Sequence, residues 1–327
     1  MISKTAKLVS TIGATTIKEV PTRNGYGEGV VLAGRTNEKV VVLCADLTES
    51  TRNEGFKKEF PDRFIQMGVH EQLLAACAAG MALEGFIPFI TSYAMFCPGR
   101  AWEMIRTNIC LNDVNVKIIG SHAGVSVGPD GATHQAIEDI AIMRPIPNMT
   151  IIAPCDSTEA RKATIALLEI AGPCYARFAR EKTPIFTTDE TPFEIGKAEV
   201  FREGNDVAII ACGPLVYNAL VAAEELSKKG IDARVINSHT IKPLDEDTIL
   251  KAAKECGGVV TVEEHQVIGG LGGAVAEYLG SACPTLIERV GVQNKFGQSG
   301  KPKELVEHYG MGVSHIMKAV EKVISKK

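Results

Sequence analysis

Short runs of β-branched and aliphatic residues alternate along this chain with longer segments of helical period. The short runs are 39–45, 115–120, 149–153, 173–178, 206–212, 232–237, 258–263 and 285–290. The segments of helical period are 71–83, 157–170, 216–229, 245–255 and 272–280. This alternation is typical of βαβ units, which build a mostly parallel sheet with helices on its faces. We therefore expect an α/β protein.

Length and linker composition indicate two domains. The chain has 327 residues, and one domain takes about 100–200 residues. The segment 181–205 has two prolines, four threonines and no sustained period, so we expect a first domain over 1–190 and a second over 191–327. Within them, Asp156 is a predicted helix N-cap and 312–327 a predicted amphipathic terminal helix.

Composition argues against several classes of protein. The net charge is −4 and no three basic residues are adjacent, so we expect no binding to nucleic acid or to an anionic membrane. The longest apolar stretch, 73–83, is shorter than the roughly 20 residues that span a bilayer. Residues 1–13 lack a continuous apolar signal core, which favours a cytoplasmic location. Nine cysteines without a Cys-x-x-Cys pair are expected to be reduced core residues.

A carboxylate stands at the start of a segment of small apolar residues. Glu71 ends the run Met-Gly-Val-His-Glu at 67–71 and precedes the run Leu-Leu-Ala-Ala-Cys-Ala-Ala-Gly-Met-Ala at 73–82. Burial there can raise the pKa of Glu71 and let it share a proton with a ligand. Alternatively, the carboxylate satisfies the first-turn amides of its own helix. The small residues would also let the helix pack closely against another subunit.

Two histidines and an aspartate lie in a glycine-rich loop, 121–135, after the expected strand 115–120. They are His122, Asp130 and His134, with glycines at 124, 128 and 131. Ligands of an open parallel sheet bind beyond the carboxyl ends of its strands. There, histidine can exchange protons near neutral pH, and histidine with aspartate can bind vicinal hydroxyls. Zinc is the competing interpretation, but no cysteine or His-Glu-x-x-His partner lies nearby.

Three further features each have a functional and a structural interpretation. Tyr93 and Phe96 would share a face of a helical turn and could stack on a planar heterocycle, although core packing is commoner. Five arginines could bind phosphate or be solvated: Arg23, Arg100, Arg106, Arg177 and Arg180. The run 269–273 opens a helix without the G-x-G-x-x-G spacing or a P-loop lysine, which favours helix–sheet packing over an anion site.

Together these segments resemble the transketolase family. The ordered set is Ala45-Asp46-Leu47-Thr48 with Ser50, Gly68-Val69-His70-Glu71, the aromatic segment, the run from Gly128 to Gln135, and Ala179-Arg180. Essentially the whole chain is similar to the C-terminal half of transketolase. The resemblance implies a pyrimidine-binding domain of thiamin diphosphate enzymes, followed by a transketolase C-terminal domain.

The resemblance also implies a role for each matched residue. Glu71 matches the glutamate that hydrogen-bonds the pyrimidine N1′ and so promotes deprotonation of the cofactor's C2. Tyr93 and Phe96 match aromatics around the aminopyrimidine; the third aromatic position falls at Gly99, and Trp102 is the candidate substitute. The substrate residues implied are His122 and His134 at the donor's C1 and C2 oxygens, Asp130 at a sugar hydroxyl, and Arg23, Ser50 and Arg180 at the phosphate.

One part of the expected cofactor site is missing from this sequence. In transketolases a separate domain with a Gly-Asp-Gly motif and a downstream asparagine holds the diphosphate and its Mg²⁺ or Ca²⁺, and no Gly-Asp-Gly occurs here. The chain therefore resembles one subunit of a split enzyme of the pentose phosphate pathway. By this resemblance it needs an N-terminal transketolase subunit, holds no metal itself, and assembles as a dimer of heterodimers. The implied reaction moves a two-carbon ketol unit between sugar phosphates.

Other members of the same superfamily are alternatives. The C-terminal part of deoxyxylulose phosphate synthase usually has Asp-Arg where this chain has Ser121-His122, and His or Gly where Gln135 stands. The beta subunit of a 2-oxo acid dehydrogenase is a second alternative, and a non-catalytic scaffold is a third. Against a scaffold, the chain keeps Glu71, both histidines and the aspartate, and a buried unpaired acid costs several kcal/mol to ionise.

Overall fold

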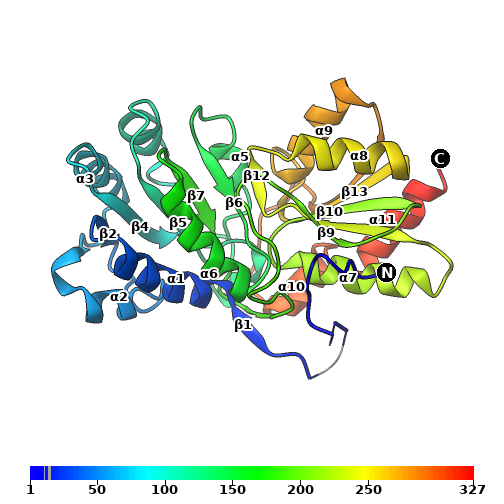
Figure 1. Cartoon of the computed structure of the whole chain (residues 1–327), viewed down its shortest axis with the longest axis horizontal. Helices are drawn as coiled ribbons and strands as arrows, with labels where there is room; N and C mark the ends of the chain where they lie inside the picture. Colours follow the sequence, from blue (N-terminus) through cyan, green and yellow to red (C-terminus); the bar gives the residue numbers. More distant parts are fainter. Residues whose placement is uncertain (11, 14–15) are drawn as a thin grey trace.

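The computed structural model describes residues 1–10, 12–13 and 16–327, and it contains two sheets side by side, each flanked by helices (Figure 1). This is the α/β architecture that the sequence predicts. Among the described residues, no helix has the length and apolar character needed to cross a membrane. All nine cysteines are free thiols in this structure; seven are buried, and Cys77 and Cys283 are partly buried.

The first sheet has seven strands, and β12 at one edge is antiparallel to its neighbour whereas the others pair in parallel. In spatial order they are β12 (Thr240–Lys242), β6 (Thr150–Ile152), β7 (Cys174–Arg177), β5 (Lys117–Ser121), β4 (Ile87–Tyr93), β2 (Val40–Cys44) and β3 (Phe64–Gln66). Its helices are α1 (Thr22–Thr36), α2 (Glu54–Glu59), α3 (Glu71–Leu83), α4 (Trp102–Met104), α5 (Asp139–Met143) and α6 (Ser157–Ala166). The pair α1 and α6 covers one face, and α3 covers the other.

The second sheet has five strands, of which only β9 is antiparallel to its neighbour. In spatial order they are β14 (Leu286–Val292), β13 (Gly258–Gln266), β10 (Val207–Ala211), β11 (Ala233–Asn237) and β9 (Glu199–Arg202). The helices are α7 (Leu215–Ser227), α8 (Glu246–Cys256), α9 (Leu271–Ala282), α10 (Pro302–His308) and α11 (Val313–Ile324). The pair α7 and α11 covers one face, and α8 and α9 cover the other (Figure 1). Strands β1 (Glu19–Pro21) and β8 (Lys182–Pro184) pair with each other as a separate antiparallel two-stranded sheet.

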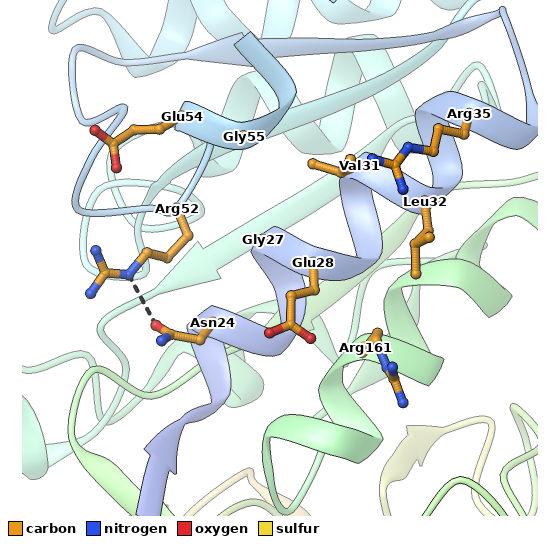
Figure 2. A pocket seen from close by; sticks show the side chains of 10 residues that line it. All are labelled: Asn24, Gly27, Glu28, Val31, Leu32, Arg35, Arg52, Glu54, Gly55 and Arg161. Carbon is orange, nitrogen blue, oxygen red and sulfur yellow. Dashed lines mark hydrogen bonds between the residues drawn. The ribbon is translucent and has the colours of Figure 1, made fainter. Parts of the chain in front are cut away.

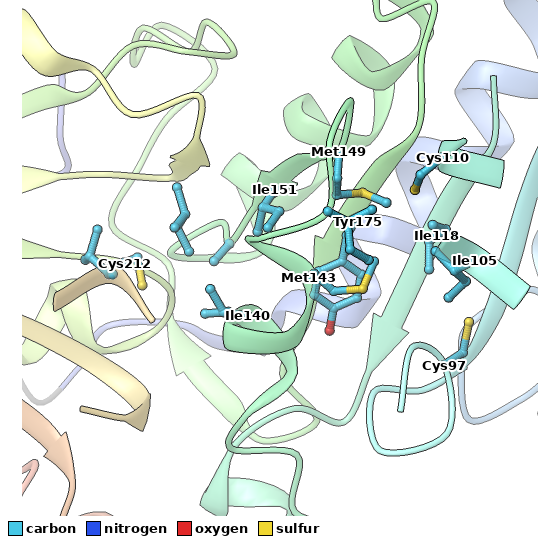
Figure 3. Close-up of a cluster of buried hydrophobic side chains, with 14 of the residues drawn as sticks. Cys97, Ile105, Cys110, Ile118, Ile140, Met143, Met149, Ile151, Tyr175 and Cys212 are labelled. Carbon is cyan, nitrogen blue, oxygen red and sulfur yellow. The ribbon is translucent and has the colours of Figure 1, made fainter. Parts of the chain in front are cut away.

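One apolar core runs through both sheets. Figure 3 shows Cys212, which follows β10, at one end of this cluster and Ile118 of β5 at the other, with Met143 between them. Two segments also cross between the sheets. Strand β12 comes from the second half of the sequence but joins the first sheet, and the Ser3 amide donates to the Phe201 carbonyl of β9 at 3.0 Å. The two sheets therefore form one packed unit.

Most predicted elements are present. The eight expected strands all occur, α3 and α8 lie where helices are predicted, and the Asp156 side chain caps α6 by accepting from the Glu159 amide at 2.9 Å. The main difference is β4, a strand that the apolar pattern does not predict; Tyr93 ends this strand and begins the expected turn, where its carbonyl accepts from the amides of Phe96 and Cys97, both at 2.8 Å. This strand lies inside the sheet and is buried on both faces, so the alternating pattern is absent. Pro88 within it further masks the strand signal.

The interpretation of the glycine-rich run 269–273 as a packing feature is confirmed. A Cβ on Gly270 would lie 2.0 Å from Glu263 Oε2, and one on Gly272 would lie 2.7 Å from Thr261 Oγ1. The Glu263 carboxylate already accepts from the amides of Leu271 and Gly272, at 2.7 and 2.8 Å. A carboxylate of the chain itself therefore occupies the start of α9.

Close packing of α1 on α6 leads to a stability prediction. A Cβ on Gly25 of α1 would lie 2.0 Å from the Ser157 carbonyl oxygen. We expect Gly25→Ala to lower the free energy of unfolding by about 1–3 kcal/mol, because overpacking forces the helices apart. Gly280→Ala is the matched control: Gly280 is exposed within α9, and a Cβ there would have no heavy atom within 4 Å. Urea denaturation of both variants measures the difference; equal stabilities would contradict the packing argument.

Glu159 leads to a prediction about pH. Its carboxylate is buried between the domains, where it accepts from the Cys155 amide and from Asn237 Nδ2 of β11, both at 2.6 Å. Burial raises the pKa of Glu159 to about 7, above the value of an exposed glutamate. The folded state therefore binds a proton that the unfolded chain releases, and this contribution to stability is complete below about pH 4.5 and is lost as the pH rises through 7.

We expect Glu159→Gln to remove the loss of stability that accompanies ionisation of this carboxyl group. The unfolding free energy of the variant relative to wild type should rise by roughly 1–3 kcal/mol between pH 4.5 and 8, since one pKa unit is about 1.4 kcal/mol. Denaturation curves of both proteins over this range test the prediction. A difference that stays constant with pH would contradict it.

Candidate functional site

The predicted site residues gather at the carboxyl edge of the first sheet. Strand β4 ends at Tyr93, β5 ends at Ser121 immediately before His122, and Glu71 begins α3 after β3. The loop after β2 carries Ser50, and the segment after β7 carries Arg180. The parallel strands therefore deliver all of these residues to one edge, as expected for an open α/β sheet, although β3 and β4 are not among the strands that the hydrophobic runs predict.

The Glu71 carboxylate is fixed by two donors from outside its own helix. It is 1% exposed, and it accepts from Ser92 Oγ of β4 at 3.1 Å and from Arg100 Nη1 at 3.0 Å. The guanidinium carbon of Arg100 also lies 4.9 Å from the centre of the Phe96 ring. Glu71 thus does not serve the first-turn amides, and Arg100, which the sequence suggested as a phosphate ligand, is its ion-pair partner.

Rings from two loops form a continuous stack beside Glu71. The ring of Tyr93 lies over that of His122 with centroids 3.8 Å apart, and it is stacked with Phe96 at 6.4 Å. The edge of His134 meets Phe96 at 5.3 Å. The aromatic pair and both predicted histidines therefore form one wall.

The third aromatic position remains without an aromatic ring. A Cβ on Gly99 would lie 2.0 Å from the Met95 carbonyl oxygen, so the turn itself requires glycine there. The Trp102 indole donates to the Ile142 carbonyl at 2.7 Å and packs against the core. The Arg100 guanidinium over Phe96 provides the neighbouring surface instead.

Hydrogen bonds define the state of His122. Arg23 Nη1 lies 3.1 Å from His122 Nε2, and Ser121 Oγ lies 2.8 Å from Nδ1. Because a guanidinium can only donate, Nε2 is the acceptor and Nδ1 carries the proton. Burial, together with the charges of Arg23 and Arg180, lowers the pKa of His122 to about 3. The imidazole is therefore neutral at neutral pH, suited to hydrogen bonding rather than to carrying a charge.

A polar cavity of about 350 Å³ opens beside this histidine. Its lining consists of Arg23, Glu49, Ser50, Arg52, Tyr93, His122, Asp130 and Arg180. Arg23 Nη1 donates to the Ser50 carbonyl at 2.8 Å, and Arg180 Nη1 donates to Asp130 Oδ2 at 3.2 Å. The structure thus brings together all four residues to which the resemblance gives phosphate or hydroxyl roles. It adds Arg52 and Glu49, which sequence reasoning missed although they flank Ser50.

The second domain holds the loop 121–135 in place. Glu264, at the carboxyl end of β13, accepts from the Ser126 amide at 2.6 Å through Oε1. A Cβ on Gly124 would lie 2.3 Å from that same oxygen, so the approach requires glycine. Gln135 Nε2 donates to the carbonyl of Gln298 at 3.0 Å. No short-range sequence signal predicts these contacts, because the partners come from the other domain.

Arg177, a further candidate phosphate ligand in the sequence, has a structural role. Its Nε donates to Asp139 Oδ2 at 2.8 Å, and its Nη2 donates to the carbonyl of Glu264 at 2.8 Å. Only 6% of Arg177 is exposed. The guanidinium therefore joins the two domains and is not available to a substrate.

Comparisons with known proteins cover both domains. Residues 18–185 match the family model of the transketolase pyrimidine binding domain, and residues 196–316 match that of the transketolase C-terminal domain. A Methanocaldococcus jannaschii protein with the provisional name transketolase C-terminal section is 46% identical over 307 residues, 93% of this chain and 96% of that protein. The 6-deoxy-6-sulfo-D-fructose transketolase subunit of Clostridium sp. is 39% identical over 305 residues, 93% of this chain and 95% of that protein.

Solved structures show the same relationship. A structure described as a split gene transketolase, inactive beta4 tetramer, matches with a TM-score of 0.88 at 43% identity, covering 94% of this chain and 99% of that chain. The match therefore includes both sheets and the edge at which the site residues lie. The chain belongs to the transketolase family.

Proposed function

We propose that this chain is the C-terminal subunit of a thiamin diphosphate-dependent transketolase that moves a two-carbon ketol unit from a ketose phosphate to an aldose phosphate. One observation carries the proposal. A buried carboxylate, an aromatic wall with two histidines and an arginine-lined cavity follow one another along a single sheet edge. This order provides successive surfaces for a heterocycle, a polyol and an anionic group.

The residues present fit the pyrimidine end of thiamin diphosphate. Glu71 supplies a fixed carboxylate oxygen for a ring nitrogen, and Tyr93 and Phe96 supply flat apolar surfaces beside it. Among the described residues no cluster of three acidic, histidine or cysteine side chains is placed to hold a metal ion. We assign the diphosphate and its Mg²⁺ or Ca²⁺ to an N-terminal transketolase subunit. When bound, the cofactor supplies a nucleophilic carbon and an electron sink for cleavage of a carbon–carbon bond.

The chain's own residues then bind and orient the reactants. Glu71 holds a proton at the pyrimidine nitrogen, and Ser92 with Arg100 keeps the carboxylate in position. His122 and His134 hydrogen-bond the oxygens of the donor sugar next to the bond that breaks. The remaining substrate contacts come from Asp130 at a hydroxyl and from Arg23, Ser50 and Arg180 at the phosphate.

An apolar face next to Glu71 is the proposed contact with the partner subunit. Val69 is 61% exposed and Leu73 is 50% exposed, on either side of the buried Glu71. An apolar groove of about 420 Å³ continues along α3, lined by Leu43, Ile65, Met67, Cys77, Gly80, Met81, Glu84 and Phe86. A partner that completes the cofactor site must approach Glu71, so this face is where it would bury apolar surface. Two such pairs would form the dimer of heterodimers.

Assembly of the two subunits tests whether this apolar face is their contact. We expect the isolated chain to show no ketol transfer and to gain activity when the N-terminal subunit is added. Leu73→Glu should abolish that gain, because a charge would be buried in the contact. Ile268→Glu is the control, since Ile268 is also exposed, at 59%, but lies in the second domain. Analytical ultracentrifugation with a coupled transketolase assay measures both; an active isolated chain would overturn the split-site proposal.

Glu71→Gln tests the chemistry. We expect the variant to assemble normally but to lose activity by roughly 10²–10⁴-fold, the usual contribution of a positioned acid or base. Exchange of the C2 proton of thiamin diphosphate, followed by NMR, should slow by a similar factor. Glu38→Gln should leave both rates unchanged, because Glu38 is exposed and precedes β2 at the opposite edge of the sheet. C2 proton exchange at the wild-type rate in Glu71→Gln would show that another acid holds the proton at the pyrimidine nitrogen. Exclusive use of pyruvate as the donor by the assembled wild-type enzyme would indicate a deoxyxylulose phosphate synthase.

A further inference from the structure

Arg52 is held in an unusual conformation at the rim of the substrate cavity. It follows β2 in the loop that carries Ser50, and its φ of 64° lies in the left-handed region that non-glycine residues rarely adopt. A Cβ on Gly27 of α1 would lie 2.7 Å from both the Cβ and the carbonyl oxygen of Arg52. The close approach of α1 and the strained backbone together fix where this side chain begins. Such strain is concentrated at functional sites.

The side chain of Arg52 is braced at its inner nitrogen. Its Nε donates to Asn24 Oδ1 of α1 at 2.9 Å, as Figure 2 shows. Within the part of the chain that the structure describes, no carbonyl or side chain accepts from its two terminal nitrogens. Figure 2 also shows these nitrogens directed away from Arg35 and Arg161, on the far side of a neighbouring groove. The terminal fork is therefore oriented but has no acceptor among the described residues.

The residues that line the cavity, Arg52 included, carry more positive than negative charge, which favours binding of an anion. Arg23 and Arg180 line the same cavity, so three arginines surround one volume of about 350 Å³. Burial, followed by repulsion from Arg52 and Arg180, lowers the pKa of Arg23 to about 10. The buried Nε of Arg23 also has no hydrogen-bond partner among the described residues. Of the two carboxylates in the lining, Asp130 is already paired with Arg180.

We propose that Arg52 is a specificity-determining residue that binds the terminal phosphate of the sugar substrate, together with Arg23 and Arg180. The inference rests on the proposed function and extends it to a residue for which the family resemblance gives no role. A guanidinium fork binds two phosphate oxygens at once. Asn24 acts through Arg52, as a positioning residue that sets the direction of this fork.

The chemistry favours phosphate over other terminal groups. A neutral hydroxymethyl end would leave three arginines balanced by only two carboxylates, Asp130 and Glu49, so the cavity would keep an excess of positive charge. A sulfonate carries one negative charge, whereas a phosphate monoester carries close to two at neutral pH. The attraction between two charges grows with their product. The third guanidinium therefore contributes more to the binding of a phosphate than to that of a sulfonate or a neutral group.

Titration of the assembled two-subunit protein with inorganic phosphate tests the inference without turnover. We expect Arg52→Ala to weaken phosphate binding roughly 10–100-fold, the usual effect of losing a hydrogen bond to a charged group. Arg52→Lys should recover part of the affinity, because it keeps the charge but not the fork. Asn24→Ala should weaken binding less than Arg52→Ala. Arg161→Ala is the matched control, because Arg161 pairs with Asp189 in the neighbouring groove and should leave phosphate affinity within about twofold.

Steady-state kinetics separate a binding role from a structural one. For a ketose phosphate, Arg52→Ala should raise KM about 10–100-fold with little change in kcat, and KM for the unphosphorylated ketose should change much less. A sulfonated ketose should lose less affinity than the phosphate. Equal losses for phosphate, sulfonate and neutral sugar, or phosphate binding within about twofold of wild type, would overturn the inference. A protein that binds phosphate through Arg52 but transfers no ketol unit would contradict only the proposed function.

Discussion

A buried ion pair between Arg177 and Asp139 lies where the two halves of this molecule meet, and its guanidinium also donates to Glu264 of the second half. Both side chains are almost fully buried, and Tyr175 donates to the same carboxylate oxygen as Arg177, at 2.6 Å. Burial alone would raise the pKa of Asp139, but the charges of Arg177 and His265 and the hydrogen bonds from Arg177 and Tyr175 together keep that pKa below its ordinary value. Separating the domains would break the hydrogen bond from this guanidinium to the Glu264 carbonyl, and a hydrogen bond to a charged group contributes roughly 1.5–3 kcal/mol. The pair therefore fixes β7, α5 and the end of β13 relative to one another.

The shape of the loop 121–135 depends on that junction. Arg177 also donates to the carbonyl of Glu264, which places the Glu264 carboxylate against the Ser126 amide. The left-handed backbone of Gly124, with φ of 87°, lets the loop pass over this carboxylate without a side chain in the way. His122 and His134 lie on either side of this contact. The second sheet thus adds no residue to the lining of the polar cavity, but it positions the loop that connects the two histidines.

Sequence patterns predict the parts of this structure that depend on local physics. The period of apolar residues locates α3 and so places Glu71 at its start, and hydrophobic runs bounded by polar residues locate the loop after β5. Contacts between distant segments leave no such pattern. Glu264 and Ser126 are 138 residues apart in the sequence. The role of Arg52 depends on its direction, which the brace from Asn24 and the approach of Gly27 set, and neither is visible in residue spacing.

The electrostatics of the cavity connect anion binding to the histidine. Positive charge from Arg23, Arg180 and Arg52 adds to burial in lowering the pKa of His122 and keeps this imidazole neutral. An anion among the three guanidinium groups would cancel part of that charge, and the pKa values of both Arg23 and His122 would then rise. The Nε2 lone pair of His122, which accepts from Arg23, would become a stronger base as the guanidinium turns to the anion. Anion binding in the cavity would in this way make His122 a stronger hydrogen-bond acceptor.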